Sequence, residues 1–222
     1  MEPDLEAGVR AAQLIVLAVR PDAAEETLRE LNVALERGGA RGPRKILVSV
    51  MAGLPLARLQ KRIRAGVRWA RAMPSPLCES GNGLTALTFG SGCDQETRAA
   101  VCRLFGTFGQ VVLLPEHQFD AFTVLYSPSH GVHALSALAD AGVEAGLSSK
   151  TALKAAAHAL GGAVAALTTS RGGLKRMVRL ATTPGGTAEA TMAGMESAGY
   201  RYAVAQGVQQ GIARARAIGS AK

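Results

Sequence analysis

The sequence predicts an α/β layer with a mainly parallel sheet, followed by an all-helical second half. In the first half, short apolar runs alternate with segments whose apolar residues recur at helical spacing, and this alternation is typical of parallel strands joined by helices. After Pro115-Glu116 there is no further strand-like run, and Ala-rich segments follow the helical period. We therefore expect two domains, one over residues 1–115 and one over residues 116–222.

The expected strands are short apolar runs that end at proline, glycine or charged residues. The first run is Leu14-Ile15-Val16-Leu17-Ala18-Val19, and its continuous apolar character is typical of a strand buried on both faces. The run stops at Arg20-Pro21, because proline cannot donate a hydrogen bond to a sheet. Pro74 ends a later run in the same way. By these criteria the strands lie at residues 14–19, 46–50, 67–73, 84–89 and 111–114.

Helices are expected where apolar residues recur every three or four positions. Leu28, Leu31 and Leu35 have this spacing, and Asp94 stands as a helix cap before another such segment. Residues 38–43 are rich in glycine and end in proline, which predicts a loop. The many Ala and Gly residues of the second half predict closely packed helices that bury themselves against a second copy. The helices are expected at residues 23–37, 55–64, 94–108, 135–143, 151–168, 188–199 and 201–218.

The charge balance is basic, but no nucleic-acid partner is expected. The 222 residues include 25 Lys and Arg against 17 Asp and Glu, a net charge of +8, without a recognisable nucleic-acid-binding motif. We interpret the densest basic run, residues 61–64 followed by Arg68 and Arg71, as a solvated helix end and the start of a strand. No apolar run reaches about 18 residues, so no membrane span is expected. Three cysteines without CxxC spacing and a mixed, acidic N-terminus predict a reduced, cytoplasmic chain.

The segment Thr183-Pro184-Gly185-Gly186-Thr187 interrupts the helical pattern near the end of the chain. Proline and two glycines favour a turn, and Thr187 stands where the next helix begins. One interpretation is an ordinary corner between two helices. The other is a small anion pocket, because the first N–H groups of a helix have no partner within it. The residues by themselves leave both interpretations open.

Other candidate sites are weaker. Gly90-Ser91-Gly92 begins like a dinucleotide-binding G-x-G-x-x-G, but Gln95 stands at the third glycine position. His130 and His133 are three residues apart, yet no third ligand is evident, so no metal site is expected.

Taken in order, several segments make the chain similar to the pyrroline-5-carboxylate reductase family. The run that ends in Ala18-Val19-Arg20-Pro21 resembles the family's Ala-Val-Lys-Pro, and Arg71-Ala72-Met73-Pro74-Ser75 resembles Arg-Val-Met-Pro-Asn. Ser49-Val50-Met51-Ala52-Gly53-Leu54 is similar to Ser-Ile-Ala-Ala-Gly-Ile. The Pro-Gly-Gly-Thr turn resembles the family's signature, and Gly199-Tyr200-Arg201 its Gly-Phe-Arg. The likeness covers nearly the whole chain.

The resemblance implies hydride transfer from NADPH or NADH to the C=N carbon of a small cyclic imine carboxylate. It implies a partial Rossmann-like domain followed by a helical dimerisation domain that interlocks with a second copy. In the family, the signature turn holds the substrate carboxylate. The substrate residues implied for this chain are Gly185, Gly186, Thr187, Ser127 and Ser129, with Thr187 as the catalytic group. The cofactor residues implied are Ala18, Val19, Arg20, Pro21, Ala52, Gly53, Met73, Pro74 and Ser75.

The chain also departs from the family pattern. It contains no intact G-x-G-x-x-G, and it begins after the family's opening strand and Gly-rich turn, which predicts an exposed sheet edge. The loop at 126–131 is shorter than the family's, Ser75 replaces an asparagine, and Val178-Arg179 replaces Arg-Asp. Three hypotheses therefore stand at this point. The chain is an active reductase, a non-catalytic dimeric paralogue, or a truncated fragment of a reductase whose true start lies upstream of Met1.

Overall fold

The described strands form one mixed sheet in the order β1-β2-β3-β4-β5. The computed structural model describes residues 4–38, 44–63, 66–81, 83–169 and 173–220. Strands β1, β2 and β3 are parallel, β4 is antiparallel to β3, and β5 is parallel to β4. The β3–β4 connection is short and holds one 3-10 helix, η2, so it cannot make the long crossover that a parallel pair requires. The strands are β1 Leu14–Leu17, β2 Ile46–Ser49, β3 Arg68–Pro74, β4 Gly83–Phe89 and β5 Gly109–Leu113.

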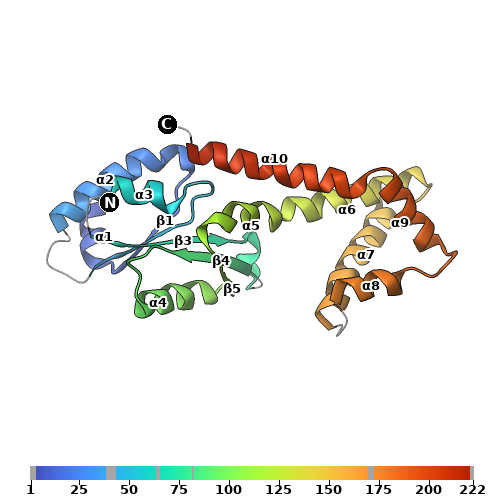
Figure 1. Ribbon diagram of the computed structural model, residues 1–222, viewed down its shortest axis with the longest axis horizontal. Coiled ribbons are helices and arrows are strands. Elements are labelled where there is room, and N and C mark those ends of the chain that lie inside the picture. The colour runs from blue at the N-terminus through green and yellow to red at the C-terminus, as the bar shows by residue number, and fades with distance from the viewer. Residues whose placement is uncertain (1–3, 39–43, 64–65, 82, 170–172, 221–222) are drawn as a thin grey trace. The chain divides into compact units, whose positions relative to one another are not determined.

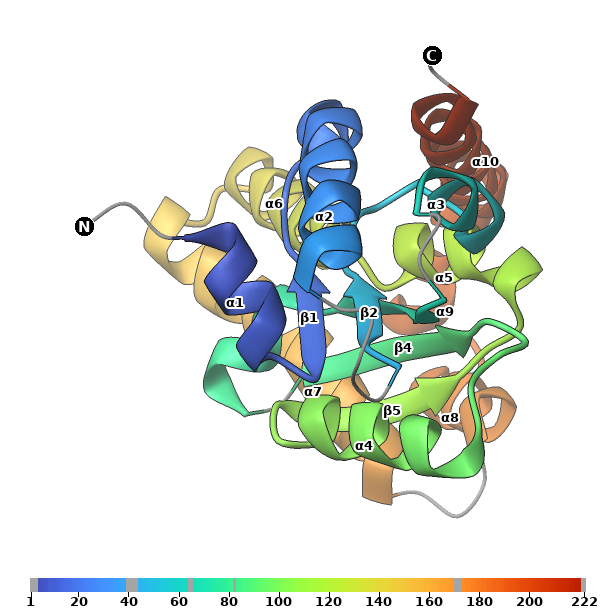
Figure 2. The ribbon, with the colours of Figure 1, turned by 90° about the vertical axis from the view of Figure 1, so that its left-hand side faces the viewer.

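Helices cover both faces of this sheet (Figure 1, Figure 2). Alternate residues of a strand point to opposite faces. Leu47 and Trp69 are buried with the helices α2 and α3, whereas Val48 and Ala70 are buried with α4. β1 is an edge strand of the described sheet, and the expectation of a strand buried on both faces is wrong at Val16, which remains 41% exposed. The helical elements of this part of the chain are α1 Leu5–Ala11, η1 Pro21–Ala23, α2 Ala24–Gly38, α3 Leu56–Arg62, η2 Pro76–Ser80, α4 Gln95–Gly106, η3 Glu116–Gln118 and α5 Phe119–Leu125.

The chain divides into two compact units. The first comprises Met1–Ser127 together with Val208–Lys222, and the second comprises Pro128–Gly207. In the second unit, α6 and α7 pack so closely that a Cβ atom built on Gly142 would lie 3.0 Å from the Cβ of Ala152. No described helix is long and apolar enough to cross a bilayer. The remaining helices are α6 Pro128–Glu144, α7 Ser149–Thr169, α8 Gly173–Ala181, α9 Thr187–Ser197 and α10 Tyr200–Ser220.

Most of the predicted elements are confirmed, with ends displaced by a few residues. Each predicted strand and helix has its counterpart, and Asp94 caps α4 by accepting a hydrogen bond from the Thr97 N–H at 2.9 Å. The pattern missed α1, α5 and α8, which are short. The expected loop at 126–131 is wrong from Pro128 onward, because α6 begins there. Residues 39–43 of the expected loop and Arg64 lie outside the described residues.

Candidate functional site

The predicted cofactor segments meet at one edge of the sheet. Because β1, β2 and β3 are parallel, with Leu17 paired to Ser49 and Ser49 paired to Arg71, their carboxyl ends lie side by side. The segment 18–21 follows β1, and Ala52-Gly53 follows β2. The segment 73–75 comprises the last two residues of β3 and the residue after it. Met73, Ser75 and Gly53 are buried, whereas Ala18 and Arg20 are exposed. The carboxyl edge of an open α/β sheet is where such folds bind ligands.

The turn at Gly53 is held by the end of the last helix. Gly53 has a φ of +74°, and a Cβ atom built on it would lie 2.6 Å from the carbonyl oxygen of Ala215 in α10. A Cβ atom on Gly219 would lie 2.1 Å from the carbonyl oxygen of Gly53. The Arg58 guanidinium, from α3, donates a hydrogen bond to the Gly219 carbonyl in the last turn of α10. The sequence pattern did not predict this close approach between the final turns of α10 and the β2–α3 turn.

A cavity of about 590 Å³ opens at this edge between α2, α3 and the end of α10. Leucine and isoleucine side chains contribute apolar walls, and Arg20, Arg58, Arg62 and Arg214 also line the cavity. Glu25 pairs with two of these cations, at 3.5 Å from Arg58 and 2.8 Å from Arg62. Four guanidinium groups therefore face two carboxylates, those of Glu25 and Asp22. The excess positive charge suits an anionic ligand.

An ion pair with a buried arginine joins β3 to η3 and, through Glu116, to the start of α3. Arg71, only 2% exposed, donates a hydrogen bond of 2.6 Å to the Glu116 carboxylate. The same carboxylate oxygen accepts the Leu56 N–H at the start of α3, at 3.1 Å. The Arg71 guanidinium also lies 4.4 Å from the centre of the Phe119 ring. Arg71 lies in β3, in agreement with the interpretation of Arg68 and Arg71 as the start of a strand, and Glu116 and Phe119 compensate for the loss of water around its guanidinium.

Tyr126 joins the end of β3 to the end of α5. Its hydroxyl donates a hydrogen bond of 2.9 Å to the carbonyl oxygen of Met73, and its ring stacks on Phe122. Burial raises the pKa of the Tyr126 phenol well above its ordinary value, so the hydroxyl remains a donor at neutral pH. This residue lies between a predicted cofactor residue and the predicted substrate residue Ser127, and the sequence pattern did not identify it.

The Pro-Gly-Gly-Thr turn ends at the first residue of α9. Gly185 has a φ of +74°, Gly186 is the N-cap, and Thr187 is the first helical residue. The Gly186 N–H donates to the Thr183 carbonyl at 2.9 Å. The Gly185 N–H donates to a carboxylate of the chain itself, Glu189 Oε2, at 2.7 Å. A negatively charged oxygen therefore already binds a main-chain N–H of this turn.

The remaining predicted residues are divided between the two units. Ser127 belongs to the first unit, and Ser129 lies in the first turn of α6 in the second. The Gly90–Gln95 stretch leads into α4, whose cap is Asp94. Within the described ranges, no group of three or more His, Cys, Asp or Glu side chains is placed to hold a metal ion.

Comparisons with known proteins point to one family. A family model described as pyrroline-5-carboxylate reductase dimerisation matches residues 116–218. The pyrroline-5-carboxylate reductase of Mycobacterium tuberculosis is 31% identical over 229 residues, which cover 95% of this chain and 78% of that protein. The structure of a Plasmodium falciparum pyrroline carboxylate reductase with NADP bound has a TM-score of 0.87 at 23% identity, covering 98% of this chain and 81% of that one. The structure of the 1-pyrroline-5-carboxylate reductase of Streptococcus pyogenes has a TM-score of 0.84 at 26% identity, and the match covers 96% of this chain and 79% of that one.

Proposed function

Because the chain belongs to the pyrroline-5-carboxylate reductase family, we propose that it reduces 1-pyrroline-5-carboxylate to proline with NADPH or NADH. The observation that carries this proposal is the meeting of the three segments 18–21, 52–53 and 73–75 at the carboxyl edge of parallel strands. The reaction adds a hydride to the imine carbon and a proton to the imine nitrogen, which converts the C=N bond into a C–N single bond.

The residues at the carboxyl edge fit a dinucleotide. Its phosphates require cations or N–H groups, and the cavity beside Arg20 and Pro21 supplies guanidinium groups above apolar walls. Ala18, Val19, Ala52 and the segment 73–75 would hold the rest of the molecule against the strand ends. When bound, the nicotinamide supplies the hydride, and the protein's own residues orient it and exclude water.

The substrate carboxylate is assigned to the Pro-Gly-Gly-Thr turn. The N–H groups at the start of α9 and the Thr187 hydroxyl are donors, and the N-terminal end of a helix favours negative charge. Gly185 and Gly186 allow close approach to the main chain, and Ser127 and Ser129 complete the proposed substrate contacts. Thr187 is the proposed catalytic group because it would contact the substrate directly.

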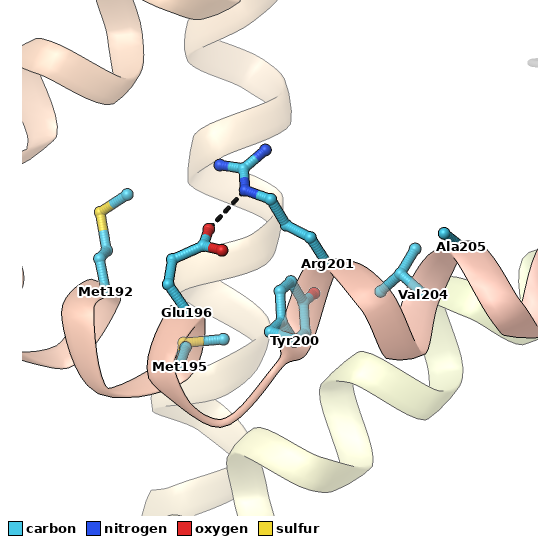
Figure 3. Close-up of a pocket in the computed structure, with 7 residues that line it drawn as sticks. All are labelled: Met192, Met195, Glu196, Tyr200, Arg201, Val204 and Ala205. Carbon is cyan, nitrogen blue, oxygen red and sulfur yellow. Dashed lines mark hydrogen bonds and ion pairs between the residues drawn. The ribbon is translucent and has the colours of Figure 1, made fainter.

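We also propose that the chain is a homodimer. Large apolar side chains of the second unit remain exposed in the single chain, among them Val164 at 66% and Leu180 at 68%. A cavity of about 470 Å³ lies where α9 turns into α10. Figure 3 shows Met195 and Tyr200 beside the ion pair of Glu196 and Arg201. A second copy would bury such surfaces. Size-exclusion chromatography with light scattering at micromolar concentration tests this assembly.

In this proposal, residues 1–115 bind the cofactor with the help of the end of α10, and residues 116–222 form the dimer and bind the substrate. The cysteines Cys78, Cys93 and Cys102 are free thiols. Free thiols support a reducing, cytoplasmic compartment for the protein.

Replacing Thr187 with alanine is expected to lower kcat/KM for the imine. The hydroxyl is proposed to donate a hydrogen bond to a carboxylate, and loss of a bond to a charged group corresponds to a factor of about ten or more. NADPH oxidation is measured at 340 nm with and without 1-pyrroline-5-carboxylate, in wild type, Thr187→Ala and Thr187→Ser.

Thr187→Ser keeps the hydroxyl and is expected to retain most of the activity. Equal kcat/KM in the alanine variant and the wild type would remove Thr187 from the substrate site. A folded wild-type protein without any imine-dependent oxidation would contradict the proposed function and favour a non-catalytic dimeric relative.

A further inference from the structure

The end of β3 is supported by a side chain from outside the sheet. Among the described strands, β2 pairs with β3 only as far as Arg71, so Met73 and Pro74 have a paired strand on the β4 side alone. The Tyr126 hydroxyl, at the end of α5, donates a hydrogen bond of 2.9 Å to the Met73 carbonyl. This bond joins two segments that are 53 residues apart in the chain, and one of them is the predicted cofactor segment 73–75.

The Tyr126 side chain is itself held in place. Its ring stacks on that of Phe122 with 4.8 Å between the ring centres, and its N–H donates to the Phe122 carbonyl at 3.0 Å. Phe119, in the first turn of α5, is fully buried in a cluster with Met73. Tyr126 and the predicted cofactor residue Ala52 both pack against this cluster. The phenol therefore has a fixed position from which it holds the main chain at the end of β3.

We propose that Tyr126 is a positioning residue for the cofactor, whose hydroxyl fixes the main chain of segment 73–75. The inference rests on the proposed function, because it takes this segment as part of the cofactor site. A site whose main chain is already ordered loses less conformational entropy when a ligand binds. Without the hydroxyl, part of the binding free energy must order the end of β3, and the dinucleotide binds more weakly. Tyr126 acts through Met73, and no contact between its own side chain and the ligand is required.

The test variant is Tyr126→Phe, which keeps the ring and its stacking and removes only the hydroxyl. The net contribution of a neutral hydrogen bond in a protein corresponds to a factor of about five in an equilibrium constant. Titration with NADPH, followed by the fluorescence of the nucleotide, is therefore expected to give a Kd about fivefold higher for Tyr126→Phe than for the wild type. Equal Kd values in the two proteins, or no NADPH binding by the wild type, overturn the proposal.

Thr123→Val is the matched control. The Thr123 hydroxyl also donates to a main-chain carbonyl, that of Phe119 at 2.7 Å, and valine has nearly the same shape as threonine. This bond lies within α5 and does not reach a cofactor segment. Urea unfolding is expected to show a small loss of stability in both variants, whereas the NADPH Kd of Thr123→Val is expected to equal that of the wild type. An equally raised Kd in both variants would mean that α5 is loosened in general, and it overturns the specific role of Tyr126.

Steady-state kinetics separate positioning from a loss of folded enzyme. In Tyr126→Phe the KM for NADPH is expected to rise about fivefold, while kcat at saturating NADPH and the KM for 1-pyrroline-5-carboxylate stay at their wild-type values. A purely structural role would lower kcat and leave both KM values unchanged. A rise in the KM for the imine alone overturns the proposal, since it places Tyr126 on the substrate side of the site. If the wild type binds NADPH but oxidises none with the imine, the proposed function fails, whereas the fluorescence titration still decides the role of Tyr126.

Discussion

Replacing Glu116 with alanine is expected to lower the free energy of unfolding by about 3 kcal/mol. Arg71 is 2% exposed, and its charge is balanced by the Glu116 carboxylate 2.6 Å away. Without that carboxylate a buried cation has no counter-ion, and breaking a buried pair in this way costs roughly 3–5 kcal/mol. The lower end applies because Glu116 is 34% exposed. The measurement is urea unfolding followed by circular dichroism, at one fixed protomer concentration.

Two further variants make this expectation specific. Glu6→Ala removes a carboxylate that also pairs with an arginine at 2.8 Å and is 36% exposed, much like Glu116. Its partner Arg37 is 68% exposed, however, so no buried cation is left unpaired and a change of less than about 1 kcal/mol is expected. The double variant Arg71→Met with Glu116→Gln leaves no buried charge and keeps an acceptor for the Leu56 N–H. It is expected to recover most of the lost stability. Equal losses in Glu6→Ala and Glu116→Ala would contradict the assignment of a buried pair.

Replacing Gly53 with alanine is expected to weaken NADPH binding at least about tenfold and to lower stability by about 2 kcal/mol. The left-handed φ of +74° costs a residue with a Cβ roughly 1–2 kcal/mol. The new Cβ would also lie 2.6 Å from the Ala215 carbonyl, which is main chain and cannot rotate away. The turn must therefore shift, and this turn is a predicted cofactor segment. Quenching or enhancement of NADPH fluorescence gives the Kd of each variant.

Gly207→Ala is the matched control for this substitution. Gly207 lies within α10, and a Cβ atom built on it meets nothing within 4 Å. Alanine is more favourable than glycine inside a helix by about 1 kcal/mol. Its NADPH affinity is expected to equal that of the wild type. Unchanged affinity in Gly53→Ala, together with a normal unfolding midpoint, would show that the turn does not contribute to cofactor binding.

The local parts of the site were predictable because short stretches of chain determine them. The strand that ends at Arg20-Pro21, the cap at Asp94 and the helix that restarts at Thr187 depend on neighbouring residues. The cofactor and substrate segments were predicted from the order of the motifs, which resembles that of the family. Hydrophobic periodicity could not detect α1 or α5, because each has only seven residues and two turns of helix carry little periodic signal.

The sequence by itself determined the alternation of strands and helices, the change to an all-helical half and the family to which the chain belongs. Only the tertiary structure decided that Arg71 is buried with Glu116, 45 residues away, and that Gly219 lies against Gly53. It also decided that Glu189 reaches back to Gly185. The physical reason is that propensity and periodicity act over a few residues. The pairing of charges and the close approach of main chains depend instead on which distant segments the fold brings together.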